Sequence, residues 1–441
     1  MSFSRLNGRA RTSAWLRRWR PLLPLLGSEM IVMIGFGALL PVLPLFVQEQ
    51  GIDAVGLGII IAAWPIAKLI FEPIFGWWAD RHERKPQMVA GLVILAFASV
   101  LPLFFSSFLA LFMLRFIAGL ATAMYDPAAR GMIVTATDED ERGEAFGFYG
   151  AFQIGGFAIG PAIGAFGAAA FGGYAFPFIF TFVLALAGAL VVAAVLSPHP
   201  HVVESEEFEH HPDAQPLPSG VPFTVSETAA VPTDERPSEP QAPLSAVFNR
   251  TVVAALVLSF GLHLSFGTYE VVWSIYLIAL GASIAWVGFT FMLFAIPEMI
   301  VSPFAGRYVD RHGPVGMVIG SGIVIIASGL IYAVARTPDI PSAVVPLEAA
   351  ATAAMTPALF SMLARGTPAG RASTAQGLFG AASTLALVVA SLAAGALFDI
   401  HIGLPFVFFV VGMIVCLIAG LLIYRSARPT PAGGALPATA D

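Results

Sequence analysis

Charged side chains inside long apolar segments are the residues of this sequence that could do chemistry. Ionisable groups in a membrane are costly, and they are usually either paired or functional. Burial raises the pKa of a carboxyl group and a nearby arginine lowers it, so an acid whose surroundings alternate can take up and release a proton. The set suits proton relay or recognition of a cation, and it comprises Glu29, Lys68, Glu72, Arg115, Asp126, His263, Glu270, Glu298 and Glu348.

Spacing places some of these residues on common helix faces. Lys68 and Glu72 are four residues apart, so they could form an ion pair along one helix that is purely structural. His263 and Glu270 are seven residues apart, which is two turns along one face. A lone histidine in such a segment is more often a hydrogen-bonded core residue than a functional one. Asp126 could be an interfacial anchor, a loop partner or a gate.

Composition identifies the elements that must position these groups as membrane helices. The chain has 441 residues, of which 57% are hydrophobic and 11% charged, with a mean hydropathy of +0.83, whereas a soluble domain has about 25% charged residues. The single cysteine, Cys416, excludes an internal disulfide. The N-terminus shows no cleavage site of a signal peptide, so we expect the first apolar segment to remain and span.

About 20 apolar residues cross a bilayer as a helix. This length predicts an all-α membrane protein with twelve spans. The first six cover residues 21–47, 56–79, 87–105, 108–134, 144–169 and 173–196. The second six cover residues 251–280, 284–307, 315–335, 341–364, 373–398 and 403–424.

Basic residues in alternate short loops predict the orientation of the spans. They precede the first span, recur in every second loop and follow the last span, whereas the opposite loops contain only Arg336. Both termini are therefore expected in the cytoplasm, and the multi-pass protein in the plasma membrane. The tails are residues 1–20 and 427–441, and the two six-helix halves are residues 21–196 and 248–426.

Residues 197–247 differ from the rest of the chain. They contain nine acidic residues and ten prolines, with almost no apolar periodicity, which predicts a disordered cytoplasmic linker. The net charge of −6 comes largely from this segment, so it indicates nothing about nucleic acid. Four linker histidines, at positions 199, 201, 210 and 211, have no fixed geometry for a metal, and we expect no metal site there.

The two halves are related by a shift of 230 positions. A charged loop at Gly76–Lys85 has a second copy at Gly306–Gly313, with Asp80 matching Asp310 and Arg81 matching Arg311. Two six-helix units in the same orientation form a parallel repeat, which is typical of transporters.

The chain resembles the major facilitator superfamily over nearly its whole length, and specifically its twelve-helix drug:proton antiporter group. Four motifs, three on helices and one in a loop, carry the resemblance. The loop motif is matched by Gly76, Asp80, Arg81, Arg84 and Lys85; the fourth-helix motif by Arg115 and Gly119; the fifth-helix antiporter motif by Gly156, Gly160, Pro161 and Gly164; and the first-helix pattern by Gly35, Pro41, Val42 and Pro44. Glu83 and Ala165 replace motif glycines, and Pro314 follows the second loop copy where basic residues are typical.

The resemblance implies a conformational latch at the loop. Asp80 would accept hydrogen bonds from the start of the eleventh helix, near Ser373, where the helix dipole is positive. Arg81 and Arg84 would add ion pairs across the halves that stabilise the outward-open state. Topogenic charge is the simpler interpretation of these basic residues. The second copy keeps Asp310 but lacks the trailing basic residues, so the two latches are expected to be unequal.

Roles for the membrane groups are also implied by the resemblance. Glu29 would lie in the cavity as proton carrier and cation partner, and Arg115 would take part in proton coupling or hold an acid of the cavity. The glycine stripe of the fifth helix would lie between the halves, although ordinary small-residue packing would produce the same pattern. Glu298 and Glu348 are candidates for proton relay or cation binding, in a cavity lined with aromatic rings such as Trp64, Tyr269, Trp273, Tyr276 and Trp286.

These features predict a secondary transporter that exchanges protons for small lipophilic or cationic compounds by alternating access. The protein is expected to be a monomer in the bilayer that binds a small-molecule substrate and protons and uses no cofactor besides the proton gradient. The sequence has no phosphate loop and no catalytic motif, which argues against ATP-driven transport and against an enzyme. An uptake symporter or facilitator for a sugar, siderophore or other nutrient stays open, as does a non-transporting sensor whose partner binds the linker.

Overall fold

The computed structural model describes residues 22–137, 142–196, 243–368 and 371–426, and within these ranges the chain is helical without strands. In the described part of the chain, twelve helical segments are long and apolar enough to cross a membrane. The predicted all-α fold with twelve spans is therefore confirmed. The two tails, most of the expected linker with its histidines, and the loop 138–141 lie outside the described residues.

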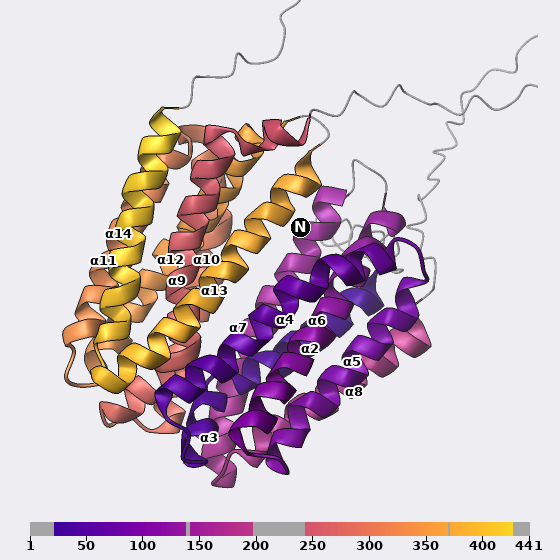
Figure 1. Cartoon of the computed structure of the whole chain (residues 1–441), viewed down its shortest axis with the longest axis vertical. Coiled ribbons are helices and arrows are strands. Elements are labelled where there is room, and N and C mark those ends of the chain that lie inside the picture. The colour runs from indigo at the N-terminus through magenta and orange to yellow at the C-terminus, as the bar shows by residue number, and fades with distance from the viewer. Residues whose placement is uncertain (1–21, 138–141, 197–242, 369–370, 427–441) are drawn as a thin grey trace, which may run out of the picture.

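The first half contains α2 (Leu23–Leu39), α3 (Leu43–Glu49), α4 (Ala54–Ala79), α5 (Arg84–Val100), α6 (Phe108–Ala136), α7 (Arg142–Phe171) and α8 (Ala175–Val195). The second half contains α9 (Arg250–Ala279), α10 (Ile284–His312), α11 (Pro314–Val334), α12 (Asp339–Gly366), α13 (Ala372–Ile400) and α14 (Leu404–Arg425). Figure 1 shows the halves as two bundles lying side by side.

Local sequence sets several helix boundaries. The expected first span is divided into α2 and α3 around Pro41, which has no backbone N–H to continue the hydrogen-bond ladder. The side chains of Asp53, Ser107, Asn249 and Ser283 accept hydrogen bonds from backbone N–H groups in the first turns of α4, α6, α9 and α10.

One boundary differs from the expected domain limits. Residues Leu244–Phe248, which include the end of the expected disordered linker, form a 3₁₀ turn. Val247 is fully buried there, so this apolar residue packs with the second half instead of belonging to the linker.

The repeat is visible in the helix boundaries. α4, α5 and α7 begin at residues 54, 84 and 142, and α10, α11 and α13 begin 230 positions later, at 284, 314 and 372. Gly51 and Gly281, also 230 positions apart, follow the first and seventh spans with φ of 76° and 93°. Only glycine adopts this left-handed backbone without strain, so the same turn is encoded twice.

The two copies of the charged loop have different backbones. Gly313 has φ of 81° and ends α10 directly before α11. Glu83, at the equivalent position, has φ of −60°, and α4 already ends at Ala79. The replacement of a glycine by Glu83 therefore coincides with a longer, differently shaped loop in the first half.

The halves are in close contact at one side of the bundle, which we call the short-loop side and define by the starts of α4 and α10. A Cβ atom added to Gly395 of α13 would lie 2.2 Å from the carbonyl oxygen of Ala54, and one added to Gly288 of α10 would lie 2.5 Å from the Cβ of Ala165. The opposite side, where α4, α8 and α14 end, is called the linker side.

Apolar packing follows the same division. One buried cluster joins the second half to residues from the short-loop end of the first half, such as Val42, Ile60 and Leu111. The linker end of the first half, including Leu25 and Met132, forms a separate cluster. The two halves thus share one buried cluster on the short-loop side, whereas the buried cluster at the linker end of the first half is separate from the second half.

Candidate functional site

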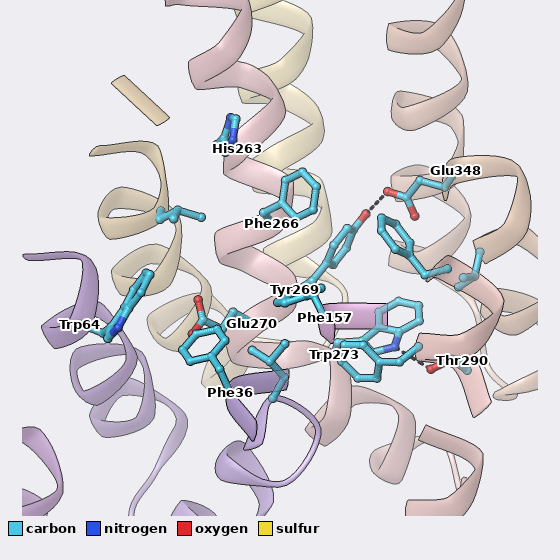
Figure 2. Close-up of a pocket in the computed structure, with 15 residues that line it drawn as sticks. Phe36, Trp64, Phe157, His263, Phe266, Tyr269, Glu270, Trp273, Thr290 and Glu348 are labelled. Atoms are coloured by element: carbon cyan, nitrogen blue, oxygen red, sulfur yellow. Dashed lines mark hydrogen bonds between the residues drawn. The ribbon is translucent and has the colours of Figure 1, made fainter. Parts of the chain in front are cut away.

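A cavity of about 320 Å³ lies between the two halves, and Figure 2 shows the side chains around it. Eight of its fifteen lining residues are aromatic, among them the expected Trp64, Tyr269 and Trp273, whereas the expected Tyr276 and Trp286 do not line it. The lining residues are Phe36, Leu40, Trp64 and Phe157 from the first half, and His263, Phe266, Tyr269, Glu270, Trp273, Thr290, Phe291, Phe294, Val345, Glu348 and Leu387 from the second.

Arg115 of α6 forms an ion pair with Glu270 of α9, and this pair joins the two halves. The two side chains are only 9% and 14% exposed. The Arg115 guanidinium carbon lies 5.7 Å from the ring centre of Phe36 and 5.9 Å from that of Trp64, within the range of cation–π attraction. Glu270 lines the cavity, so a proton or cation that enters meets a carboxylate already bound to an arginine of the other half.

Glu348 of α12 lies on the opposite wall and is 2% exposed. Its two carboxylate oxygens accept hydrogen bonds from the hydroxyl groups of Tyr269 and Tyr332, the latter at 2.7 Å. The ring of Tyr269 is 5.5 Å from that of Trp273, and both rings line the cavity. This wall therefore offers π faces next to a carboxyl group held by two tyrosines, of which Figure 2 shows Tyr269.

His263 lines the same cavity and is nearer to the start of α9 than Tyr269 and Glu270 (Figure 2). Its Nδ1 atom is 2.8 Å from the carbonyl oxygen of Ser259, which can only accept, so Nδ1 carries the hydrogen. In the neutral ring Nε2 is then an acceptor. His263 is thus both hydrogen-bonded and part of the cavity lining, although from the sequence a hydrogen-bonded core residue and a functional residue were alternatives.

A second cavity of about 210 Å³ adjoins the first and shares Phe157, Phe266, Phe291 and Phe294 with it. Its polar side chains are Gln153 of α7 and Glu298 of α10. Glu298 is half-buried and has no hydrogen-bond or ion-pair partner among the described residues.

Glu29 lines neither of these two cavities, contrary to the expected position of this residue in the cavity wall. Its side chain is fully buried, and the amide nitrogen of Gln153 donates a 2.8 Å hydrogen bond to its Oε1 atom. The other oxygen, Oε2, has no partner in the described part of the chain. α2 turns Glu29 toward α7, and Gln153 lies between it and the second cavity.

The expected pair of Lys68 with Glu72 is not the one that forms. Lys68 pairs with Asp126, and Glu72 pairs with Arg130. α4 and α6 run in parallel, so both pairs join residues 58 positions apart and make a ladder of alternating charge between the two helices. Asp126 is 13% exposed and is therefore a partner within the first half instead of an interfacial anchor.

The glycine stripe of α7 contacts α2 of the same half, not the other half. Cβ atoms added to Gly156, Gly160 and Gly164 would lie 2.5, 2.4 and 2.0 Å from the carbonyl oxygens of Met30, Ile34 and Ala38. The face of α7 that meets α10 carries Ala162 and Ala165 instead. The stripe is thus a close helix–helix contact of the small-residue type.

The loop residues assigned to the latch contact only their own half in the interactions we observe. The Asp80 side chain is 75% exposed and lies 4.0 Å from Arg84, which donates to the Thr135 hydroxyl. Arg81 covers the Trp77 ring at 4.1 Å. None of these described contacts joins the loop to the start of α13, so the latch to the second half stays a prediction.

Further loop groups also lie at the surface of the linker side. A Cβ atom added to Gly306 would have no neighbouring atom within 4 Å. Asp310 and Arg311 are exposed. Lys85 is partly buried at the start of α5.

Three residues of this arrangement were missed from the sequence. Gln153 is a polar residue in an apolar span, which was a usable signal. Tyr332 was indistinguishable from many other aromatic residues. Asp399 follows directly after the expected eleventh span and was not considered, yet it accepts hydrogen bonds from the first N–H groups of α4 in the other half, at 3.3 and 3.2 Å.

Comparison with known proteins adds three findings. A model of the family described as Major Facilitator Superfamily matches residues 25–277 and 256–440. Multidrug resistance protein 2 of Bacillus subtilis is 29% identical over 187 residues, which are 42% of this chain and 46% of the relative. Quinolone resistance protein NorA of Staphylococcus aureus is 25% identical over 249 residues, which are 56% and 55% of the two chains. The matched stretches span about half the length of these relatives.

Solved structures resemble the fold over nearly all of the chain. A bacterial homologue of the human lysosomal transporter Spinster, in an inward-facing and unoccupied conformation, aligns with a TM-score of 0.70 at 14% identity, over 94% of this chain and 99% of the other. The nucleoside transporter NupG aligns with a TM-score of 0.68 at 12% identity, over 92% of this chain and 99% of the other. At such identities the likeness concerns the fold alone.

Proposed function

The chain belongs to the Major Facilitator Superfamily, as its resemblance to the drug:proton antiporter group predicted, and on this premise we propose that it exports small lipophilic cations in exchange for protons. It is a multi-pass membrane transporter and not an enzyme. The names of its relatives, a multidrug resistance protein and a quinolone resistance protein, support export of drug-like compounds. The chemistry of the cavity supports a cationic, partly aromatic substrate.

The observation that carries the proposal is the Arg115–Glu270 pair in the cavity wall. Removal of one partner of a buried pair leaves an uncompensated charge, which costs about 3–5 kcal/mol. A proton on Glu270, or a cation bound to it, would weaken its hold on Arg115 of the other half. Occupancy of the cavity and contact between the halves are therefore coupled through one carboxyl group, and proton and substrate compete for it.

Alternating access would require the opposite closure to form. In this proposal the protein is a monomer in the plasma membrane, and its linker side and both termini face the cytoplasm. The structure is then the inward-open state. Asp80 would then meet the start of α13 when the linker side closes, with Arg81, Arg84 and Lys85 nearby. Asp310 and Arg311 would form the weaker second latch. Gly160 and Pro161, at the close contact of α7 with α2, would let α7 follow the movement of its own half.

Reconstituted vesicles provide the test. With an acidic interior and ethidium added outside, an antiporter accumulates ethidium while protons leave, both followed by fluorescence. Glu270→Gln should abolish the coupled proton efflux. Glu49→Gln, which changes an exposed carboxyl at the end of α3, should leave it intact.

Each alternative predicts another result in the same vesicles. A nutrient symporter would move its substrate and protons in the same direction, and a facilitator would move substrate without protons. A non-transporting sensor would move neither. The proposed exchange would be contradicted if ethidium moved together with protons, moved without protons, or did not move at all.

A further inference from the structure

We infer that the second cavity is an ammonium subsite in which Glu298 and Gln153 bind the N–H groups of a protonated amine. The inference rests on the proposed function, because it names the chemical class of cation that the transporter distinguishes. It concerns residues that the Arg115–Glu270 coupling does not use.

The first step is the state of the acids around the two cavities. Glu270 is paired with Arg115, and Glu348 accepts from two tyrosine hydroxyls. Glu298 alone of these three has neither an ion-pair nor a hydrogen-bond partner among the described residues. An unpaired carboxyl group at membrane depth is costly unless a ligand or a proton satisfies it.

The second step is the polarity of the second cavity. Its only polar side chains in the described structure are Glu298 and Gln153, and no basic residue lines it. Gln153 donates through its amide nitrogen to Glu29, so its amide oxygen is left as an acceptor without a protein partner in the described chain. The site thus offers a carboxylate and an amide oxygen from opposite halves, and it lacks a positive charge.

The third step is the type of cation that fits these acceptors. Charge-assisted hydrogen bonds from N–H to a carboxylate are short and about twice as strong as neutral ones. A primary ammonium supplies such bonds, whereas a quaternary ammonium has no N–H and interacts best with aromatic faces. The shared rings Phe157, Phe266, Phe291 and Phe294 connect the subsite with the aromatic cavity, where the remainder of an aryl-alkylamine would lie.

Binding to the purified full-length protein tests the inference without a proton gradient. The probes are a dansyl-labelled primary alkylamine and its trimethylammonium analogue, measured by fluorescence. A charge-assisted hydrogen bond contributes about 1.5–3 kcal/mol, so we expect the primary amine to bind at least about tenfold more tightly. Glu298→Gln should reduce this ratio to about one, and Glu298→Asp should keep a preference for the primary amine while binding it more weakly.

The controls separate this inference from the proposed function. Glu49→Gln should keep the wild-type ratio, and thermal melting verifies that each variant is folded. If Glu298→Gln does not fold, the ratio of the two affinities in the wild type and in Glu298→Asp still tests the subsite. Equal affinities in the wild type, no binding of either probe, or an unchanged ratio in Glu298→Gln would each overturn the subsite. Proton-coupled ethidium transport could persist in all these cases, so failure of the subsite is distinct from failure of the exchange.

Discussion

The carboxylate of Asp399, at the end of α13, accepts hydrogen bonds from the backbone N–H of Ala54 and Val55, at the start of α4 in the other half. Asp53 accepts from the next free donor of the same turn, Gly56. The first N–H groups of a helix have no partner within the helix. The second half therefore completes the cap of a helix in the first half, and it does so on the side where the structure is closed.

We predict that Asp399→Asn weakens this closure. An exposed acid at a helix N-terminus is worth about 0.3–1 kcal/mol, so the ratio of closed to open short-loop side should fall about two- to fivefold. Spin labels at positions 50 and 336, in a Cys416→Ser background, would report the change as a larger population at long distance. The control is Asp339→Asn, which changes an exposed acid in the first turn of α12 on the same side. An equal shift in both variants would contradict the prediction.

Asp80 would play the reciprocal part, because it lies at the C-terminal end of α4 as Asp399 lies at that of α13. In the present state its side chain is 75% exposed. We therefore expect Asp80→Asn to leave this state intact and to destabilise the state closed on the linker side, opposite in sign to Asp399→Asn. Labels at positions 86 and 316, which are equivalent in the repeat, would show a smaller population at short distance.

Asp310→Asn is the matched control for Asp80→Asn, because it changes the same residue of the second loop copy. Its effect should be smaller, since that copy lacks the trailing basic residues and has the different turn at Gly313. A larger effect of Asp310→Asn would reverse the assignment of the main latch.

Helix positions were predictable because they depend on local composition. Long apolar runs, the 230-residue shift and capping residues such as Asp53 and Ser283 lie in continuous stretches of sequence. The starts of α4 and α10 consequently fell within two residues of the expected spans. Pro41 was visible too, but whether a proline bends or divides a span depends on its tertiary surroundings.

Side-chain partners were less predictable, because they depend on how helices are rotated against one another. Lys68 and Glu72 satisfy the spacing rule for a pair within α4, yet α6 offers Asp126 and Arg130 at the same height, and both pairs form across helices. Glu29 was placed in the cavity by resemblance, but Gln153 separates it from the second cavity. Of the nine ionisable residues singled out from the sequence, His263, Glu270, Glu298 and Glu348 line the two cavities. The sequence did not indicate which of them were already paired.

The Arg115–Glu270 pair makes a prediction about stability that differs for single and double substitutions. Arg115→Ala alone leaves Glu270 buried without a counter-charge, and Glu270→Gln alone leaves Arg115 so. Arg115→Ala should therefore lower the free energy of unfolding by about 3–5 kcal/mol. The double variant Arg115→Met with Glu270→Met, which removes both charges, should recover much of this loss. Thermal melting in detergent measures all of them.

Transport gives the complementary measurement for this pair. The double variant should be stable and yet inactive in proton-coupled ethidium uptake, because the carboxyl group that binds the proton is gone. A stable, fully coupled double variant would refute the role of Glu270. A double variant less stable than Arg115→Ala would refute the assignment of the pair as the source of the loss.

The last prediction concerns the contact between α2 and α7. A Cβ at Gly164 would lie 2.0 Å from the carbonyl oxygen of Ala38, so Gly164→Ala must push two backbones apart. Overpacking of this kind costs about 1–3 kcal/mol. Gly150→Ala makes the same change on the same helix where no atom lies within 4 Å of the new Cβ. Alanine is the better helix former by about 1 kcal/mol, so Gly150→Ala should leave the melting temperature unchanged or raise it while Gly164→Ala lowers it. Equal destabilisation by both would show that the helix needs glycine for flexibility along its length, and not for close approach at this one contact.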